Sequence, residues 1–322
     1  MKLVISSHTL AVLLFFTSSL GAIGNIDFVA DYSAEGADEG FNDPTLGASR
    51  RAAFAYSLSI WENYLTESYT GETIVVQAVF DPLGGTSDSA VLGRASANSG
   101  AIISGNTFAG TPLASHIKGL NTNGTSPDIQ ITFNSDIDNQ TVLGPQDFYY
   151  GTDANPGFDS DFVTIALHEI AHGLDFSSDV RSDGTFGNSS LSKIYDQFLI
   201  DSATGGTALS GMTDSERLAA ITDNSLYWSG SHATAANGGR RVQMYAPSPY
   251  EKGSSVSHVD ETTHGQLTLS PKFNDDIINH EISALELGIL KDMGWNIASV
   301  PEPSTTLCFS LGMLGLGLRR KR

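Results

Sequence analysis

The chain has 322 residues, and its formal net charge at pH 7 is −19. Residues 25–303 alone carry 12 basic and 36 acidic side chains, a net charge of −24, which argues against nucleic acids and anionic membrane surfaces as partners. The only cysteine is Cys308, near the C-terminus, so residues 25–303 have neither a disulfide bond nor thiol chemistry and must be stabilised by their core.

Residues 1–24 have the layout of a secretory signal peptide. A single positive charge at Lys2 precedes an apolar run over residues 10–16, and small residues follow at 18–22. We therefore expect export of the chain, with cleavage near Ala22 or Gly24. A buried N-terminal strand or helix is the alternative interpretation.

The pattern of apolar residues predicts one α+β domain over residues 25–298. The segment 48–65 has apolar residues at helical spacing and predicts an amphipathic helix, whereas 73–80 and 128–134 predict strands. The intervening stretch 83–127 is rich in Gly, Ser and Asn and predicts loops with short strands. Further elements are expected as helices around 192–201, 213–221 and 281–295 and a strand at 241–247. This order of elements predicts an α+β fold with a cleft.

The segment 160–174 predicts the most regular helix of the chain. Apolar residues from Val163 to Leu174 recur at spacings of four, three and four, and form a stripe that should pack inward. Ser160 or Asp161 can cap the N-terminus of this helix.

The same helix carries a metal-binding pattern. His168, Glu169 and His172 have the spacing H-E-x-x-H. Histidines four residues apart lie on one face of a helix, about 6 Å apart, so both can bind one divalent ion with the carboxylate beside it. Two ordinary surface histidines are the alternative interpretation.

The sequence from residue 168 resembles the zincin metallopeptidases, and among them the leishmanolysin-like branch, whose motif continues H-x-L-G-F where this chain has H-G-L-D-F at 172–176. The resemblance implies that His168 and His172 are zinc ligands and that Glu169 is the general base. It also implies a mixed sheet, an active-site helix and a cleft above an irregular C-terminal subdomain that starts near residue 177. The chain departs from metzincins at Asp175, where they place a glycine, although Asp tolerates the left-handed conformation better than most residues.

The third zinc ligand must come from further along the chain, because Ser178 stands where the strict metzincin pattern has its third histidine. A catalytic zinc ion usually takes three protein ligands and leaves one position open. We favour His258, in 253-GSSVSHVDE-261, and place His264 second. Glu281 is a further option, with capping of the last helix as its alternative role. The remaining candidates are His116, His232 and His280.

The segment 226–295 resembles the C-terminal half of secreted bacterial zincin-like proteins, in which an S-H-x-D-E histidine completes the site. In those proteins an L-M-x-P turn lies under the metal. The matching residues here are 267–271, L-T-L-S-P, without a methionine. Asp260 and Glu261 either orient the ligand histidine or form a solvated acidic turn.

Residues 299–322 resemble the PEP-CTERM sorting signal of Gram-negative bacteria that make extracellular polysaccharide. A V-P-E-P turn precedes an uncharged stretch over 304–318, and four basic residues end the chain. The resemblance implies recognition by an exosortase, transient membrane contact through the tail, and a final location at the cell surface or outside the cell. A plain C-terminal anchor is the alternative.

The sequence therefore predicts a zinc metalloendopeptidase that hydrolyses protein or peptide substrates, with Glu169 as general base on a metal-activated water. Tyr227, Tyr245 and Tyr250 are candidate oxyanion donors. The alternatives are a non-catalytic matrix or surface protein on a decayed zincin scaffold, and a zinc hydrolase that acts on another amide or ester. Structural Ca²⁺ in the Asp-rich loops is a further prediction, although the chain has no EF-hand loop.

Overall fold

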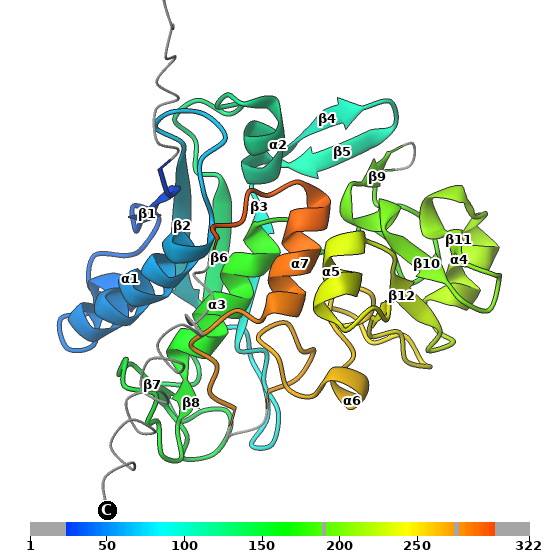
Figure 1. Cartoon of the computed structure of the whole chain (residues 1–322). Coiled ribbons are helices and arrows are strands. Elements are labelled where there is room, and N and C mark those ends of the chain that lie inside the picture. Colours follow the sequence, from blue (N-terminus) through cyan, green and yellow to red (C-terminus); the bar gives the residue numbers. More distant parts are fainter. Residues whose placement is uncertain (1–23, 189–190, 274–276, 300–322) are drawn as a thin grey trace, which may run out of the picture.

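The computed structural model describes residues 24–188, 191–273 and 277–299 (Figure 1). The predicted signal peptide, except for its last residue, and the tail beyond residue 299 lie outside these ranges. The described residues form a mixed α+β structure with several sheets, as expected. None of the helices within these ranges is both long and apolar enough to cross a bilayer. The division into two lobes near residue 176 stays a prediction.

The main sheet has the strand order β1-β2-β6-β3. Its strands are β1 (Asp27–Asp31), β2 (Thr73–Asp81), β6 (Ile129–Asn134) and β3 (Gly93–Ala97). The first three run parallel, and β3 pairs antiparallel with β6 at the edge of the sheet. In β2, buried residues alternate with half-buried ones from Ile74 to Phe80, so one face of the sheet forms the core.

Two long helices cover the main sheet. Helix α1 (Gly47–Tyr64) contacts β1, α3 (Phe162–Gly173) contacts β6 and β3, and the two helices contact each other (Figure 1). The predicted stripe of α3, from Val163 to Leu174, is fully buried. Helix α1 is amphipathic, as expected: Ala53, Leu58 and Trp61 are buried, whereas Tyr56 is 37% exposed.

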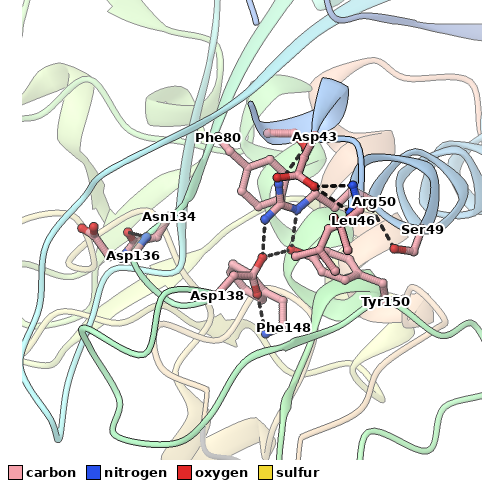
Figure 2. Close-up of polar contacts among 12 residues, drawn as sticks. Asp43, Leu46, Ser49, Arg50, Phe80, Asn134, Asp136, Asp138, Phe148 and Tyr150 are labelled. Carbon is pink, nitrogen blue, oxygen red and sulfur yellow. Dashed lines mark hydrogen bonds and ion pairs between the residues drawn. The ribbon is translucent and has the colours of Figure 1, made fainter. Parts of the chain in front are cut away.

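A buried arginine ties α1 to the long loop that leads into α3 (Figure 2). The Arg50 guanidinium donates to Asp138 at 2.6 Å, to the Tyr150 hydroxyl at 3.1 Å and to the Gly40 carbonyl at 2.7 Å. It also lies 4.3 Å from the centre of the Phe80 ring. Asp138 accepts in addition from the Tyr150 hydroxyl. Arg50, Asp138 and Tyr150 are therefore hydrogen-bonded to one another.

The predicted helix around 192–201 is wrong. Its residues instead form β9 (Ser192–Lys193), a 3₁₀ turn (Tyr195–Gln197) and β10 (Leu199–Asp201). Strand β10 pairs with β12 (Leu226–Trp228), and this long-range pairing overrides the local pattern. The full order of this second sheet is β11-β10-β12-β13, with β11 at Thr207–Ala208 and β13 at Val242–Gln243.

Short helices complete the C-terminal part of the chain: α4 (Asp214–Ala220), α5 (Ser231–Ala236), α6 (Glu261–His264) and α7 (Ala284–Met293). Helix α4 was expected. Helices α5 and α7 pack against each other (Figure 1). The expected strand at 241–247 is reduced to β13, and the last helix starts three residues later than expected, because Ser283 and Glu286 form its capping box.

The stretch 83–127 contains more structure than expected. Besides β3 it holds the hairpin β4 (Gly100–Ser104) and β5 (Thr107–Gly110), and helix α2 (Thr111–Lys118). Strand β5 also pairs with β9. The remaining small elements are β7 (Phe148–Tyr149), which pairs with β8 (Ser160–Asp161), and 3₁₀ turns at Gly40–Asn42 and Leu209–Gly211.

Candidate metal centre

Helix α3 begins at a fixed point. Asp161 is its N-cap and accepts from the backbone N–H of Thr164 at 2.8 Å and from its hydroxyl at 2.7 Å. His280 Nε2 lies 2.9 Å from the same Asp161 oxygen. Of the two expected caps, Asp161 is therefore the one in the structure. The predicted ligands His168 and His172 follow it on the same helix.

Three histidines converge beside this helix. The Nε2 atoms of His168 and His172 lie 3.0 Å apart, and each lies 3.2 Å from Nε2 of His258. In a zinc tetrahedron with ordinary Zn–N bonds, two ligand nitrogens lie about 3.4 Å apart. The triangle of nitrogens therefore has nearly the size of one face of such a tetrahedron. The structure brings together the three predicted ligands; their binding of a metal stays a prediction.

Hydrogen bonds to backbone carbonyls fix the tautomer of each ring. Nδ1 of His168 lies 2.7 Å from the Thr268 carbonyl oxygen, Nδ1 of His172 lies 2.7 Å from that of Phe176, and Nδ1 of His258 lies 2.7 Å from that of Ser254. A carbonyl oxygen can only accept, so each Nδ1 carries the proton. The three Nε2 lone pairs then face one another without a proton between them, which is the arrangement that a metal ligand needs.

The surroundings of the cluster favour neutral imidazoles. Burial lowers the pKa of His172 to about 4 and that of His258 to about 3. Burial and the two neighbouring histidines also hold the pKa of His168 well below its usual value. Unprotonated rings are the form that binds metal ions, and at neutral pH all three histidines are in that form.

Glu169 lies buried beside the cluster. Its side chain is 4% exposed, and its Oε2 atom has no hydrogen-bond partner among the described residues. Burial raises the pKa of this carboxyl to about 8. Strand β3 makes room for it at Gly93, where a Cβ atom would lie 2.8 Å from Glu169 Oε1. Gly93 was not anticipated from the sequence, because it stands in a stretch that was expected to be mostly loop.

The chain turns after His172 although it has Asp175 where metzincins have a glycine. Asp175 takes a φ of 77°, in the left-handed region that its side chain was expected to tolerate. This buried carboxylate accepts from the Gly110 backbone N–H at 2.9 Å and pairs with Lys193 Nζ at 2.7 Å. Gly173 allows the helix end to approach β6, since a Cβ there would lie 2.3 Å from a methyl carbon of Ile129.

The turn at residues 267–271 lies against the cluster, although it lacks a methionine. Its Thr268 carbonyl orients His168, as described above. Leu269 is fully buried, and its backbone N–H donates to Glu286 at 2.6 Å. Glu286 is itself fully buried in the capping box of α7, so the last helix supports the turn that holds His168.

The other candidate ligands lie elsewhere. His116 bonds to Glu72 and to the Asn296 backbone N–H, His264 Nε2 accepts from the Gln243 backbone N–H, and His280 contacts Asp161. His232 and Glu281 are exposed. The alternative role of Glu281 as a helix cap is wrong, because Ser283 is the cap of α7.

The neighbours of His258 also differ from expectation. Neither Asp260 nor Glu261 orients this ring; the Ser254 carbonyl does. Asp260 is buried and caps α6, where it accepts from the Thr263 backbone N–H at 2.8 Å. Two residues before His258, Val256 has a φ of 75°, which is a strained conformation for a β-branched residue.

A cleft of about 800 Å³ opens over the cluster. Glu169 and the three histidines line it, together with residues 93–95 of the edge strand β3 and the segments 252–254 and 271–273. None of the three candidate tyrosines is part of the described lining. Within the described residues, the three histidines are the one group of three or more His, Cys, Asp or Glu side chains whose ligand atoms lie within 4.8 Å of one another. Structural Ca²⁺ stays a prediction.

Comparison with known families identifies one segment. Residues 299–322 match the PEP-CTERM protein-sorting motif, which indicates export and C-terminal sorting to the cell surface and implies recognition by exosortase-type processing machinery. No curated protein and no solved structure matches the chain. The character of residues 25–298 therefore has to be argued from the site itself.

Proposed function

We propose that this chain is a zinc-dependent metallopeptidase that is sorted to the cell surface. The proposal rests on one observation: three imidazole nitrogens with fixed tautomers converge next to a buried, unpaired carboxylate. Imidazole donors suit zinc as well as copper, iron and nickel, and a nitrogen triangle of nearly the size of a tetrahedral face favours zinc among these metals. Three protein ligands with one open position are typical of catalytic rather than structural zinc sites.

In this proposal His168, His172 and His258 hold the ion, and the three backbone carbonyls keep their rings in place. When bound, zinc supplies Lewis acidity toward a carbonyl group and a water molecule. Glu169 accepts the proton of the attacking water at its unpaired Oε2 atom and donates it to the leaving amine. The pKa of about 8 belongs to the metal-free site; a neighbouring divalent cation favours the ionised carboxylate, which can act as a base at neutral pH.

The shape of the cleft favours a peptide as substrate. Strand β3 is the edge of the main sheet, and residues 93–95 of that strand line the cleft. The backbone N–H and C=O groups of an edge strand can pair with an added extended segment. Because Gly93 adjoins Glu169, a peptide paired with this edge would pass the general base.

The buried state of Glu169 argues against the non-catalytic alternative. Glu169 has no hydrogen-bond partner among the described residues and lines the cleft, and a site that only stabilises the fold has no use for a carboxylate at this position. Orphaned polar groups of this kind are expected at sites that act on a ligand. The zinc hydrolase acting on another amide or ester has no specific observation in its favour.

The test compares Glu169→Gln with Glu216→Gln in the full-length protein. Glu216 is an exposed carboxylate on α4, so it controls for the same chemical change. We expect Glu169→Gln to lower the turnover of casein or a fluorogenic peptide by about 10²- to 10⁴-fold, with unchanged zinc content, and Glu216→Gln to leave both unchanged. Wild-type protein that binds zinc without turnover supports the matrix protein, and wild-type protein without zinc removes the metal site.

A further inference from the structure

A second pocket, of about 520 Å³, lies on the sheet β11-β10-β12-β13 and shares no lining residue with the cleft. We call it the arginine pocket. Its lining consists of Ser202, Tyr227, Asn237, Arg240, Arg241, Gln243, Thr263 and His264. Every one of these side chains carries a polar group, two are cations, and none is a carboxylate. The lining is therefore positively charged, whereas residues 25–303 as a whole carry a net charge of −24.

The frame of the arginine pocket is held by internal hydrogen bonds. Gln243 donates from its backbone N–H to His264 Nε2 at 3.0 Å, and its side chain accepts from the Thr263 hydroxyl at 2.8 Å. The Asn237 side chain donates to the carbonyl oxygens of Arg240 and Arg241 at 3.0 and 3.2 Å. The turn that carries both arginines is therefore fixed before any ligand arrives.

The functional groups left over are mostly donors. Both arginine side chains are exposed and have no salt bridge or hydrogen bond within the described parts of the chain. His264 Nε2 accepts a hydrogen bond, so the proton stays on Nδ1, which is a second kind of free donor. The Tyr227 hydroxyl has no described partner either. A surface with this excess of N–H and O–H donors is complementary to oxygen anions.

Nearby carboxylates do not neutralise the arginines. Asp201, at the end of β10, accepts from the Ala203 backbone N–H at 2.9 Å and from Ser225. Asp260, which precedes α6, accepts from the Thr263 backbone N–H and the Thr262 hydroxyl. Both carboxylates are buried and already bonded, so the charge of the two guanidinium groups remains available to a ligand.

We propose that the arginine pocket binds a carboxylate-bearing saccharide, of the uronic acid type. Guanidinium groups bind carboxylates through paired, charge-assisted hydrogen bonds. The Ser202 hydroxyl and the Asn237 side-chain oxygen, which have no described partner, suit the hydroxyls of a sugar, and the Tyr227 ring lines the same pocket. A pocket of this size holds an organic ligand rather than a single inorganic ion. The lack of aliphatic side chains in the lining disfavours the side chains of a peptide.

The test uses the full-length protein and digalacturonate, with binding measured by isothermal titration calorimetry. We expect digalacturonate to bind and the uncharged disaccharide galactobiose to bind at least about tenfold more weakly. Arg240→Ala/Arg241→Ala should reduce the association constant for digalacturonate by about tenfold or more. Lys118→Ala/Lys291→Ala removes the same charge from two exposed positions, on α2 and α7, and should leave binding unchanged.

Three results would overturn the proposal. These are equal binding of both disaccharides, an unchanged association constant in the arginine variant, and binding of tetraglutamate at least as tight as that of digalacturonate, which would identify an acidic peptide instead. The same titration with Glu169→Gln should match wild type. Saccharide binding and peptide hydrolysis can therefore fail independently of each other.

Discussion

The two halves of the candidate metal centre are built in different ways. His168 and His172 stand four residues apart on α3, so the helical repeat alone places both rings on one face. His258 comes 86 residues after His172 and belongs to no helix or strand. The His258 ring is held by the Ser254 carbonyl, and the His258 backbone carbonyl accepts from the Tyr245 backbone N–H at 2.9 Å. The strained Val256 precedes it by two residues. A helix supplies ligands through its geometry, whereas an irregular segment needs several separate contacts for one ligand.

Removal of the distant ligand is expected to have the largest effect. Loss of a group that only orients a ligand lowers metal affinity by about 10–100-fold, so His258→Ala, which removes a ligand, should lower zinc affinity by more than about 100-fold. His172→Ala should do the same. His264→Ala, the second candidate from the sequence, should leave zinc affinity unchanged in competition titrations with a chelator. If His264→Ala loses zinc and His258→Ala keeps it, the distant half has been assigned to the wrong residue.

The support of the helical half can be tested at Arg50. This side chain is 5% exposed and bonded to Asp138 and Tyr150 (Figure 2). Arg50→Ala leaves the Asp138 carboxylate buried without its partner, so the free energy of unfolding should fall by about 3–5 kcal/mol in urea denaturation. Lys118→Ala, on the exposed end of α2, should change it by less than about 0.5 kcal/mol. An equal, small change in both variants would contradict a buried ion pair at this position.

The helical half also depends on a segment that is distant in the sequence, and this dependence can be tested at Glu286. This carboxylate holds both the Leu269 backbone N–H, in the turn under His168, and the Ser283 backbone N–H, in the cap of α7. Glu286→Ala should lower zinc affinity by about 10–100-fold. Ser283→Ala breaks the cap alone, so it should lower stability by about 1 kcal/mol and leave zinc affinity unchanged. Equal zinc affinities in the two variants would show that the turn does not need Glu286.

The sequence predicted the helical half well, because a helix of this length shows its period in the chain. The expected helix 160–174 is α3 (Phe162–Gly173), and the strand 73–80 is β2 (Thr73–Asp81). The elements between residues 177 and 283 are two to seven residues long, which is too short for a hydrophobic period to appear. The helix expected around 192–201 was wrong because the long-range pairing of β10 with β12 overrides the local pattern.

The same contrast applies to the site. His168, Glu169 and His172 could be chosen from their spacing, whereas His258 could be ranked first only through a resemblance. The carbonyls that orient the rings, such as that of Thr268, left no trace in the sequence, since every residue has a carbonyl. Gly93 was missed because its effect, room for Glu169, exists only once β3 has joined β6.

The smallest expected effect is the pH dependence of the free energy of unfolding. The histidines of the cluster and Glu169 should contribute to it with opposite signs. Burial lowers the pKa of His172 to about 4 and that of His258 to about 3, from 6.5. Their contribution to stability is thus complete above pH 6.5 and is lost as the pH falls toward these lower values. Burial raises the pKa of Glu169 from 4.5 to about 8, so its contribution is complete below pH 4.5 and is lost as the pH rises to about 8.

Urea denaturation of the full-length protein in excess chelator, at pH 7 and pH 5, measures the balance of these opposing contributions. The wild type should lose free energy of unfolding at the lower pH, because the histidines outnumber the carboxylate. Glu169→Gln should lose more, since the opposing contribution is gone, and His172→Gln/His258→Gln should lose less. A smaller loss in Glu169→Gln than in wild type would contradict a raised pKa for this carboxyl. Burial should raise the pKa of the acid and lower the pKa of the imidazoles, because it disfavours the charged form of each.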